Sequence, residues 1–161
     1  MAGVEISAAS DKQEIVFERV FDAPRELVFK AFTDPELLPK WLGPRTLTMT
    51  VAESDPKQGG VWRFVHRAPD GTEFAFRGVF HDVAAPERIV RTFEFGGEPG
   101  RVSLETATFD ELNGKTTLKG KSVFQTVEDR DRRLTGMRKG LSESMDRLAD
   151  LLRDLQARRA S

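Results

Sequence analysis

Three ionisable residues, His66, Arg91 and Glu105, fall where alternation in the sequence predicts the apolar face of a β-sheet. Buried charges are costly unless they are paired, so Arg91 and Glu105 are expected to bond each other or a ligand. A desolvated imidazole or carboxylate can also act as a base near neutral pH. Two interpretations therefore remain open: a binding or catalytic cluster, and a structural salt bridge beside a packed histidine.

Other kinds of chemistry are excluded by what the chain lacks. It has no Cys, and therefore no disulfide, thiolate zinc site or cysteine nucleophile. No Gly-x-Ser-x-Gly, His-Glu-x-x-His, P-loop or Rossmann fingerprint occurs. The two histidines, His66 and His81, are not spaced as metal ligands. We therefore assign no catalytic residue, no metal and no cofactor.

The composition predicts one ordinary domain without a preference for polyanions. The chain has 161 residues, and its 25 Lys and Arg balance 26 Asp and Glu to a formal net charge of −1. This balance gives no reason to expect nucleic acid as a partner, and no apolar run approaches the roughly 18 residues of a membrane span. We expect a cytoplasmic monomer or homodimer, with a flexible tail over residues 1–12 and a single domain over residues 13–158.

Hydrophobic alternation and turn signals predict an α+β chain in which an antiparallel meander separates two helical regions. Pro24 suits the first position of a short helix, and a second short helix is expected from Asp34 to Trp41. Asn113-Gly114 is the strongest hairpin signal in the chain. The strands are expected over residues 14–21, 47–51, 61–67, 73–83, 87–95, 102–109 and 115–124.

The last segment, residues 129–157, has the periodicity of one long helix with an apolar stripe from Leu134 to Leu155. Its charged residues 129–133 are expected to form a solvated face or a frayed end. Gly136 and Gly140 lie one turn apart near the stripe, and each costs roughly 1 kcal/mol relative to Ala in a helix. Either a close approach to the sheet or space for a ligand is expected to require them.

Turn positions also predict which residues face each other across neighbouring strands. The predicted pairs are Trp62–Gly78, Phe64–Phe76, His66–Phe74, Arg91–Glu105, Phe93–Ser103, Phe109–Leu118, Ala107–Gly120 and Glu105–Ser122. These pairs belong to one inward face, which also holds Phe80, Ile89, Phe95 and Phe124. Small residues on that face, among them Gly78, Gly120 and Ser122, are expected to leave room beneath the last helix.

Residues 20–44 carry a recognisable signature, with Ala23-Pro24, Thr33-Asp34-Pro35 and Trp41 before Gly43-Pro44. Further along, the matching features are Gly59-Gly60, the Pro69-Asp70-Gly71 turn, Phe76-Arg77-Gly78 and Pro86-Glu87-Arg88-Ile89. Over about residues 14–155 the chain resembles bacterial relatives of the activator of the ninety-kilodalton heat-shock chaperone's ATPase. These relatives belong to the START-like superfamily, also called birch-pollen-allergen-like or SRPBCC.

The resemblance implies a helix-grip fold, in which a curved antiparallel sheet wraps around the C-terminal helix and two short helices follow the first strand. In such folds the cavity between helix and sheet commonly holds an apolar or amphipathic molecule, such as a lipid or polyketide. The family also implies possible chaperone contact and a role in the stress response. Leu42 and Leu141 replace tryptophans that the family often has, so the ligand cannot be inherited from relatives.

The leading hypothesis is binding of a small hydrophobic or amphipathic molecule, with no catalysis required. The alternatives are a cyclase, dehydratase or hydrolase acting on a polyketide-like or aromatic substrate, and a module that activates a chaperone ATPase. Phenylalanines would form the walls, His66, Arg91 and Glu105 would orient a polar end, and Trp41 would act as a lid. The expected ligand-binding residues are Trp41, Trp62, Phe64, His66, Phe76, Gly78, Phe80, Arg91, Phe93, Glu105, Gly120, Ser122, Met137 and Leu141.

Overall fold

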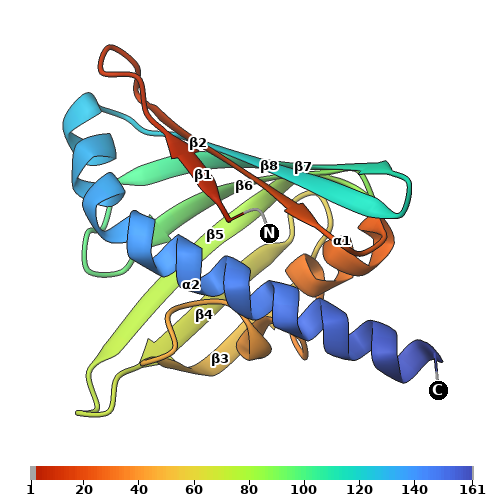
Figure 1. Cartoon of the computed structure of the whole chain (residues 1–161). Helices are drawn as coiled ribbons and strands as arrows, with labels where there is room; N and C mark the ends of the chain where they lie inside the picture. The colour runs from red at the N-terminus through yellow and green to blue at the C-terminus, as the bar shows by residue number, and fades with distance from the viewer. Residues whose placement is uncertain (1–2, 161) are drawn as a thin grey trace.

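The computed structural model describes residues 3–160 and consists of an eight-stranded antiparallel sheet that curves around one long helix (Figure 1). The strand order is β1-β2-β8-β7-β6-β5-β4-β3, so every strand from β3 to β8 lies beside its neighbour in the chain. The strands are β1 (Glu5–Ser7), β2 (Glu14–Phe21), β3 (Thr48–Ser54), β4 (Val61–Arg67), β5 (Glu73–Ala84), β6 (Arg88–Phe95), β7 (Val102–Leu112) and β8 (Lys115–Val123).

Three helical segments complete the fold: α1 (Arg25–Thr33), the 3₁₀ turn η1 (Leu38–Lys40) and the 34-residue α2 (Val127–Ala160). Figure 1 shows α2, in blue, running obliquely across the sheet, with α1 near the ends of β7 and β8. This arrangement confirms the predicted α+β helix-grip architecture. No helix within residues 3–160 combines the length and apolar character needed to cross a membrane.

The predicted strand register is confirmed on all three hairpins. All eight predicted pairs occur, among them Arg91 opposite Glu105 and Ala107 opposite Gly120. Between β7 and β8, Asn113 and Gly114 have φ values of 53° and 77°. Positive φ at both central residues is the backbone of a tight hairpin turn whose twist matches the flanking strands, which is why this dipeptide fixes the register.

Two local predictions differ in part from the structure. Residues 5–7 of the expected flexible tail form β1, which pairs with β2 and thereby covers part of an otherwise open sheet edge. Within residues 34–41 the predicted second short helix is present only as the 3₁₀ turn η1, with turns before it, because Pro39 lies inside the segment and has no N–H to donate. The predicted cap residue Asp34 does cap this turn, because its side chain accepts a hydrogen bond from the Glu36 N–H at 2.8 Å.

A register shift in β5 interrupts the predicted alternation between Phe80 and Asp82. Phe80 pairs with Arg91, but beyond the shift Val83 pairs with Ile89. Val83 packs against the core, while Asp82 accepts a hydrogen bond from the exposed Arg88. The bulge therefore keeps a carboxylate off the inward face.

The dense core lies beneath the C-terminal half of α2. Met145, Leu148 and Leu152 are at most 2% exposed and belong to one cluster with Phe109 and Leu118. This cluster fixes the second half of α2 against the sheet and α1. It thereby determines where the first half of the helix lies above strands β4 to β7.

Candidate functional site

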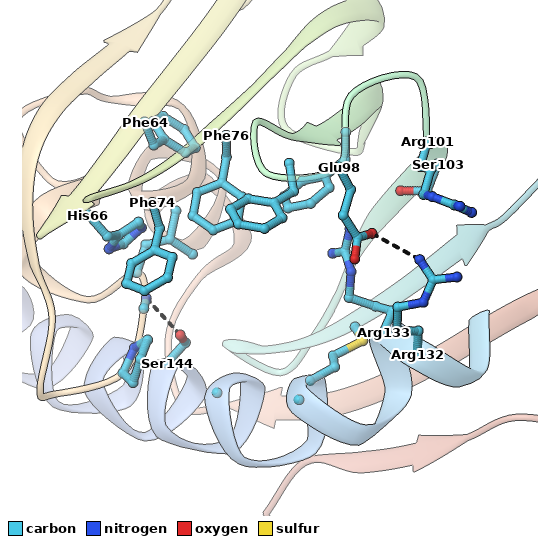
Figure 2. A pocket seen from close by; sticks show the side chains of 18 of the residues that line it. Phe64, His66, Phe74, Phe76, Glu98, Arg101, Ser103, Arg132, Arg133 and Ser144 are labelled. Atoms are coloured by element: carbon cyan, nitrogen blue, oxygen red, sulfur yellow. Dashed lines mark hydrogen bonds and ion pairs between the residues drawn. The ribbon is translucent and has the colours of Figure 1, made fainter. Parts of the chain in front are cut away.

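A cavity of about 620 Å³ lies between the first half of α2 and the sheet (Figure 2). Six phenylalanines line it, and Phe76 is central among them, with ring centroids 5.5 Å from Phe93 and 5.2 Å from Phe95. Its walls come from the segment after η1, from β4, β5, β6 and β7, from the β6–β7 connection, from Phe124 after β8, and from α2. The α2 residues that line it are Asp129, Arg132, Arg133, Gly136, Met137, Gly140 and Ser144.

The two helical glycines border open space. A Cβ built on Gly136 or Gly140 would have no atom within 4 Å outside its own helix and its chain neighbours. Close approach to the sheet, one of the two explanations predicted for these residues, is therefore wrong. Both glycines line the cavity, so the absence of their side chains enlarges the space available there.

The room predicted at the sheet glycines is already filled. A Cβ on Gly78 would lie 1.9 Å from the Thr92 carbonyl oxygen and 2.5 Å from Trp62 Nε1. A Cβ on Gly120 would lie 2.0 Å from the ring of Phe17. These glycines accommodate neighbouring protein atoms, and the prediction that they open the cavity is corrected accordingly.

The structure brings only part of the predicted set together at the cavity wall. The predicted residues that line it are Phe64, His66, Phe76, Arg91, Phe93 and Met137. Those outside its lining are Trp41, Trp62, Gly78, Phe80, Glu105, Gly120, Ser122 and Leu141. Alternation predicts which face a side chain joins, but the distance from α2 to that face decides whether a neighbour covers it.

Trp41, expected to act as a lid, is instead a core residue. It is 1% exposed, and its indole N–H donates a hydrogen bond to the Ala31 carbonyl at 2.9 Å. Its ring also packs on Phe32, with centroids 4.7 Å apart. A side chain held on both its polar and apolar sides anchors the segment that follows α1.

One end of the cavity is formed by His66, Phe74 and Ser144 (Figure 2). His66 is buried, and its Nδ1 has no hydrogen-bond partner in the described part of the chain. Burial and, to a lesser degree, the positive charge of Arg147 lower the pKa of His66. The imidazole is therefore neutral at pH 7, which makes this end of the cavity polar but uncharged.

Residues 43–45 are tied to the middle of α2 beside His66. The Gly43 N–H donates to Ser144 Oγ at 2.8 Å, and the Arg45 N–H donates to Glu143 at 2.9 Å. Arg147 donates to the Gly43 carbonyl at 2.8 Å. These bonds join the segment to α2 at the point where the dense core begins.

Arg91 and Glu105 bond each other, one of the two outcomes predicted for them. The Arg91 Nε donates to a Glu105 oxygen at 3.0 Å, and both side chains are about one-fifth exposed. The guanidinium also lies over the Trp62 ring, 4.2 Å from its centroid. Because Glu105 is engaged by Arg91 and lies outside the cavity lining, it is not a free carboxylate facing a ligand.

The other end of the cavity is rich in arginine, a feature that the predicted site residues do not include. Figure 2 shows Arg101, Ser103, Arg132 and Arg133 there, together with Glu98. Arg132 pairs with Glu98 at 3.4 Å, and this is the ion pair drawn in the figure. The expectation that residues 129–133 form only a solvated face or frayed end is therefore wrong for this wall.

Arg133 differs from the other arginines in its surroundings. Its guanidinium carbon lies 4.2 Å from the Phe93 ring centroid and 5.8 Å from that of Phe124. Burial is the main cause that lowers its pKa, opposed by attraction to Glu105 and Glu98. The helical spacing could have revealed its position, because Arg133 precedes the stripe residue Met137 by four positions and so shares its face.

Comparison with solved structures identifies close structural likenesses among bacterial proteins. A Rhodobacter sphaeroides protein is 27% identical with a TM-score of 0.87, and the match covers 94% of this chain and 99% of that one. A Chromobacterium violaceum protein is 29% identical with a TM-score of 0.75, covering 87% and 96%. An AHSA1-like protein from Aeromonas hydrophila, 22% identical with a TM-score of 0.71, covers 86% and 94% and shows the shared fold.

Comparison with curated proteins found no match. The family model described as "Activator of Hsp90 ATPase homolog 1-like protein" matches residues 22–153, well over half of the chain. The matched region runs from the start of α1 through the cavity-lining half of α2 and most of the core-forming half. The chain therefore belongs to the family of Activator of Hsp90 ATPase homolog 1-like proteins, within the START-like superfamily.

Proposed function

We propose that this protein binds a small hydrophobic or amphipathic molecule in the cavity between α2 and the sheet. The cavity's volume of about 620 Å³ falls within the usual range for small-molecule sites, roughly 300–1,000 Å³. Its aromatic walls would bury an apolar body. The polar groups at its two ends would orient that body.

The observation that carries this proposal is the open space at Gly136 and Gly140. Each glycine costs a helix roughly 1 kcal/mol relative to alanine, and no neighbouring protein atom requires either of them. Side chains around an unfilled space also lose dispersion contacts that close packing would give. A ligand that occupies the space would supply those contacts and give the two glycines a function.

Fluorescence and thermal unfolding would test this proposal. N-phenyl-1-naphthylamine, an uncharged dye whose emission rises in apolar surroundings, would be titrated into the full chain, and a panel of apolar and amphipathic compounds would be screened for displacement and for raised melting temperature. We expect saturable binding of the dye. Absence of dye binding, together with no change in melting temperature across the panel, would overturn the proposal.

Substitutions at Gly140 provide a matched pair of variants. Gly140→Phe would place a ring in the cavity and is expected to weaken dye binding at least about tenfold, because it occupies apolar contact area worth several kcal/mol. Gly140→Ala adds one methyl group and should retain binding. Equal affinity in both variants would place the dye elsewhere on the protein, against the proposal.

A further inference from the structure

We propose that the ligand of this cavity carries a single acidic group, such as a carboxylate, and that Arg133 binds this group with a hydrogen bond from Ser103. This inference rests on the proposed function, because it concerns the chemical class of the same ligand. It assigns an anionic amphiphile, with an aromatic or alkyl body, and it fixes the ligand's direction in the cavity.

Among the described residues, the charges around the cavity leave one arginine without a paired carboxylate. Four arginines line it, namely Arg91, Arg101, Arg132 and Arg133, and the lining acids are Glu98 and Asp129. Arg101 pairs with Asp129 and Arg132 with Glu98, while Arg91 pairs with Glu105 just outside the lining. Within residues 3–160, Arg133 has neither a hydrogen bond nor an ion pair, although Glu98 and Glu105 attract it from farther away.

Arg133 nevertheless lies in partly buried, apolar surroundings. Its guanidinium carbon lies over the Phe93 ring, and these aromatic neighbours offer no hydrogen-bond acceptor. A guanidinium has five N–H donors, and leaving them without acceptors away from water is costly. It also keeps its positive charge at any ordinary pH. These properties favour an acidic group of the ligand as the missing acceptor.

Ser103 is a second unsatisfied group at the same end of the cavity (Figure 2). It is 2% exposed, and its Oγ has no hydrogen-bond partner in the described part of the chain. A hydroxyl can donate to a carboxylate oxygen while the guanidinium binds the same group. Two independent polar groups without partners therefore line the end where the unmatched charge lies.

The opposite end would not compete for the acidic group. His66 is neutral at pH 7 because burial lowers its pKa, and the phenylalanines that line the cavity offer no charge. The proposal therefore places the acid at Arg133 and the apolar body against Phe76 and its neighbours.

A matched pair of dyes would test the inference. 8-Anilinonaphthalene-1-sulfonate has the same aromatic body as N-phenyl-1-naphthylamine and adds one negative charge. In Arg133→Gln we expect the affinity for the sulfonate to fall about 10- to 100-fold, the range for a hydrogen bond to a charged group. The affinity for the uncharged dye should change less than about threefold. Ser103→Ala should lower the affinity for the sulfonate by a smaller factor, about 2- to 10-fold.

Arg138→Gln is the control for loss of charge. Arg138 is exposed on the same helix and lies outside the cavity lining, so its replacement should change either affinity less than about twofold. Arg133→Lys keeps a cation but loses the planar donor set. Its affinity for the sulfonate should therefore lie between those of the native protein and Arg133→Gln. Cooperative thermal unfolding of each variant would establish that it remains folded.

The outcomes separate the two proposals. If neither dye binds the native protein and the compound panel also fails, the proposed function is wrong. If both dyes bind but Arg133→Gln weakens them equally, or if Arg138→Gln has the same effect as Arg133→Gln, the acid-binding role of Arg133 is wrong while the cavity proposal stands. The inference is supported if the Arg133 and Ser103 variants lose affinity for the sulfonate and keep their affinity for the uncharged dye.

Discussion

The two halves of α2 face the same sheet but meet it in different ways. In residues 145–160, Met145, Leu148 and Leu152 are almost completely buried in a continuous core. In residues 127–144, Leu134, Met137 and Leu141 continue the same apolar stripe but are only partly buried, and a cavity lies beneath this half. One helical periodicity thus serves dense packing at one end and open space at the other. The stripe predicts which side turns inward, not whether that side is filled.

The largest contrast is expected from removing an apolar side chain in each half. Leu148→Ala should lower the free energy of unfolding by about 2–5 kcal/mol, because it leaves a void in a closed core. Met137→Ala should cost less than about 1 kcal/mol, since its side chain borders space that is already open. Denaturant unfolding of both variants measures the difference. Equal losses would show that the two halves are packed alike.

A second contrast compares one substitution, glycine to alanine, in the sheet and in the helix. Gly78→Ala should destabilise the protein by about 1–3 kcal/mol, because the new methyl group would collide with the Thr92 carbonyl, and backbone cannot move aside cheaply. Thermal unfolding would measure the loss. A neutral outcome would contradict the close contact between β5 and β6 at this point.

Gly136→Ala and Gly140→Ala should change the stability in the opposite direction to Gly78→Ala. Each should stabilise the protein by up to about 1 kcal/mol, because alanine favours the helix and no neighbour opposes the methyl group. The corresponding rise in melting temperature is about 2–4 °C for a chain of this size. A fall in either variant would mean that α2 lies closer to the sheet than the structure shows.

The smallest expected effect is the pH dependence due to His66. Its pKa is lowered in the folded protein, so the unfolded chain takes up the proton first as the pH falls. Stability should therefore decrease below about pH 6.5, the ordinary histidine value, until the pH passes the folded pKa, and this contribution should be level above pH 6.5. The denaturant midpoints of the native protein and of His66→Gln would be measured from pH 5 to 8. The difference between them at each pH gives the contribution of His66. A difference of the opposite sign would mean that folding stabilises the imidazolium.

Most of the sheet could be predicted from the sequence because short turns determine register. Asn113-Gly114 alone places Phe109 opposite Leu118 and Glu105 opposite Ser122. The position of the cavity could not be derived in this way. It depends on where the core formed by Leu148 and its neighbours fixes α2 above the sheet, and that distance has no local sequence signal.

The same missing distance explains why several predicted site residues lie outside the cavity lining. Phe80 is on the predicted inward face but is 1% exposed within the core, whereas Phe95, on the same face, lines the cavity. Arg133 lies in a run of charged residues, and such a run predicts a solvated face for all its members. Only the three-dimensional arrangement of the strands beneath α2 shows that the Arg133 guanidinium has no hydrogen bond or ion pair within residues 3–160.

The bonds between residues 43–45 and α2 have a mechanical consequence. They fasten the helix where its two halves join, with Ser144 and Arg147 on one side and the Gly43 backbone on the other. A ligand that pushes α2 outward would therefore bend or tilt the part of the helix that precedes these hydrogen bonds, residues 127–142. Residues 145–160 would stay packed in the core. The cavity could then accommodate ligands of different thickness without any change in core packing.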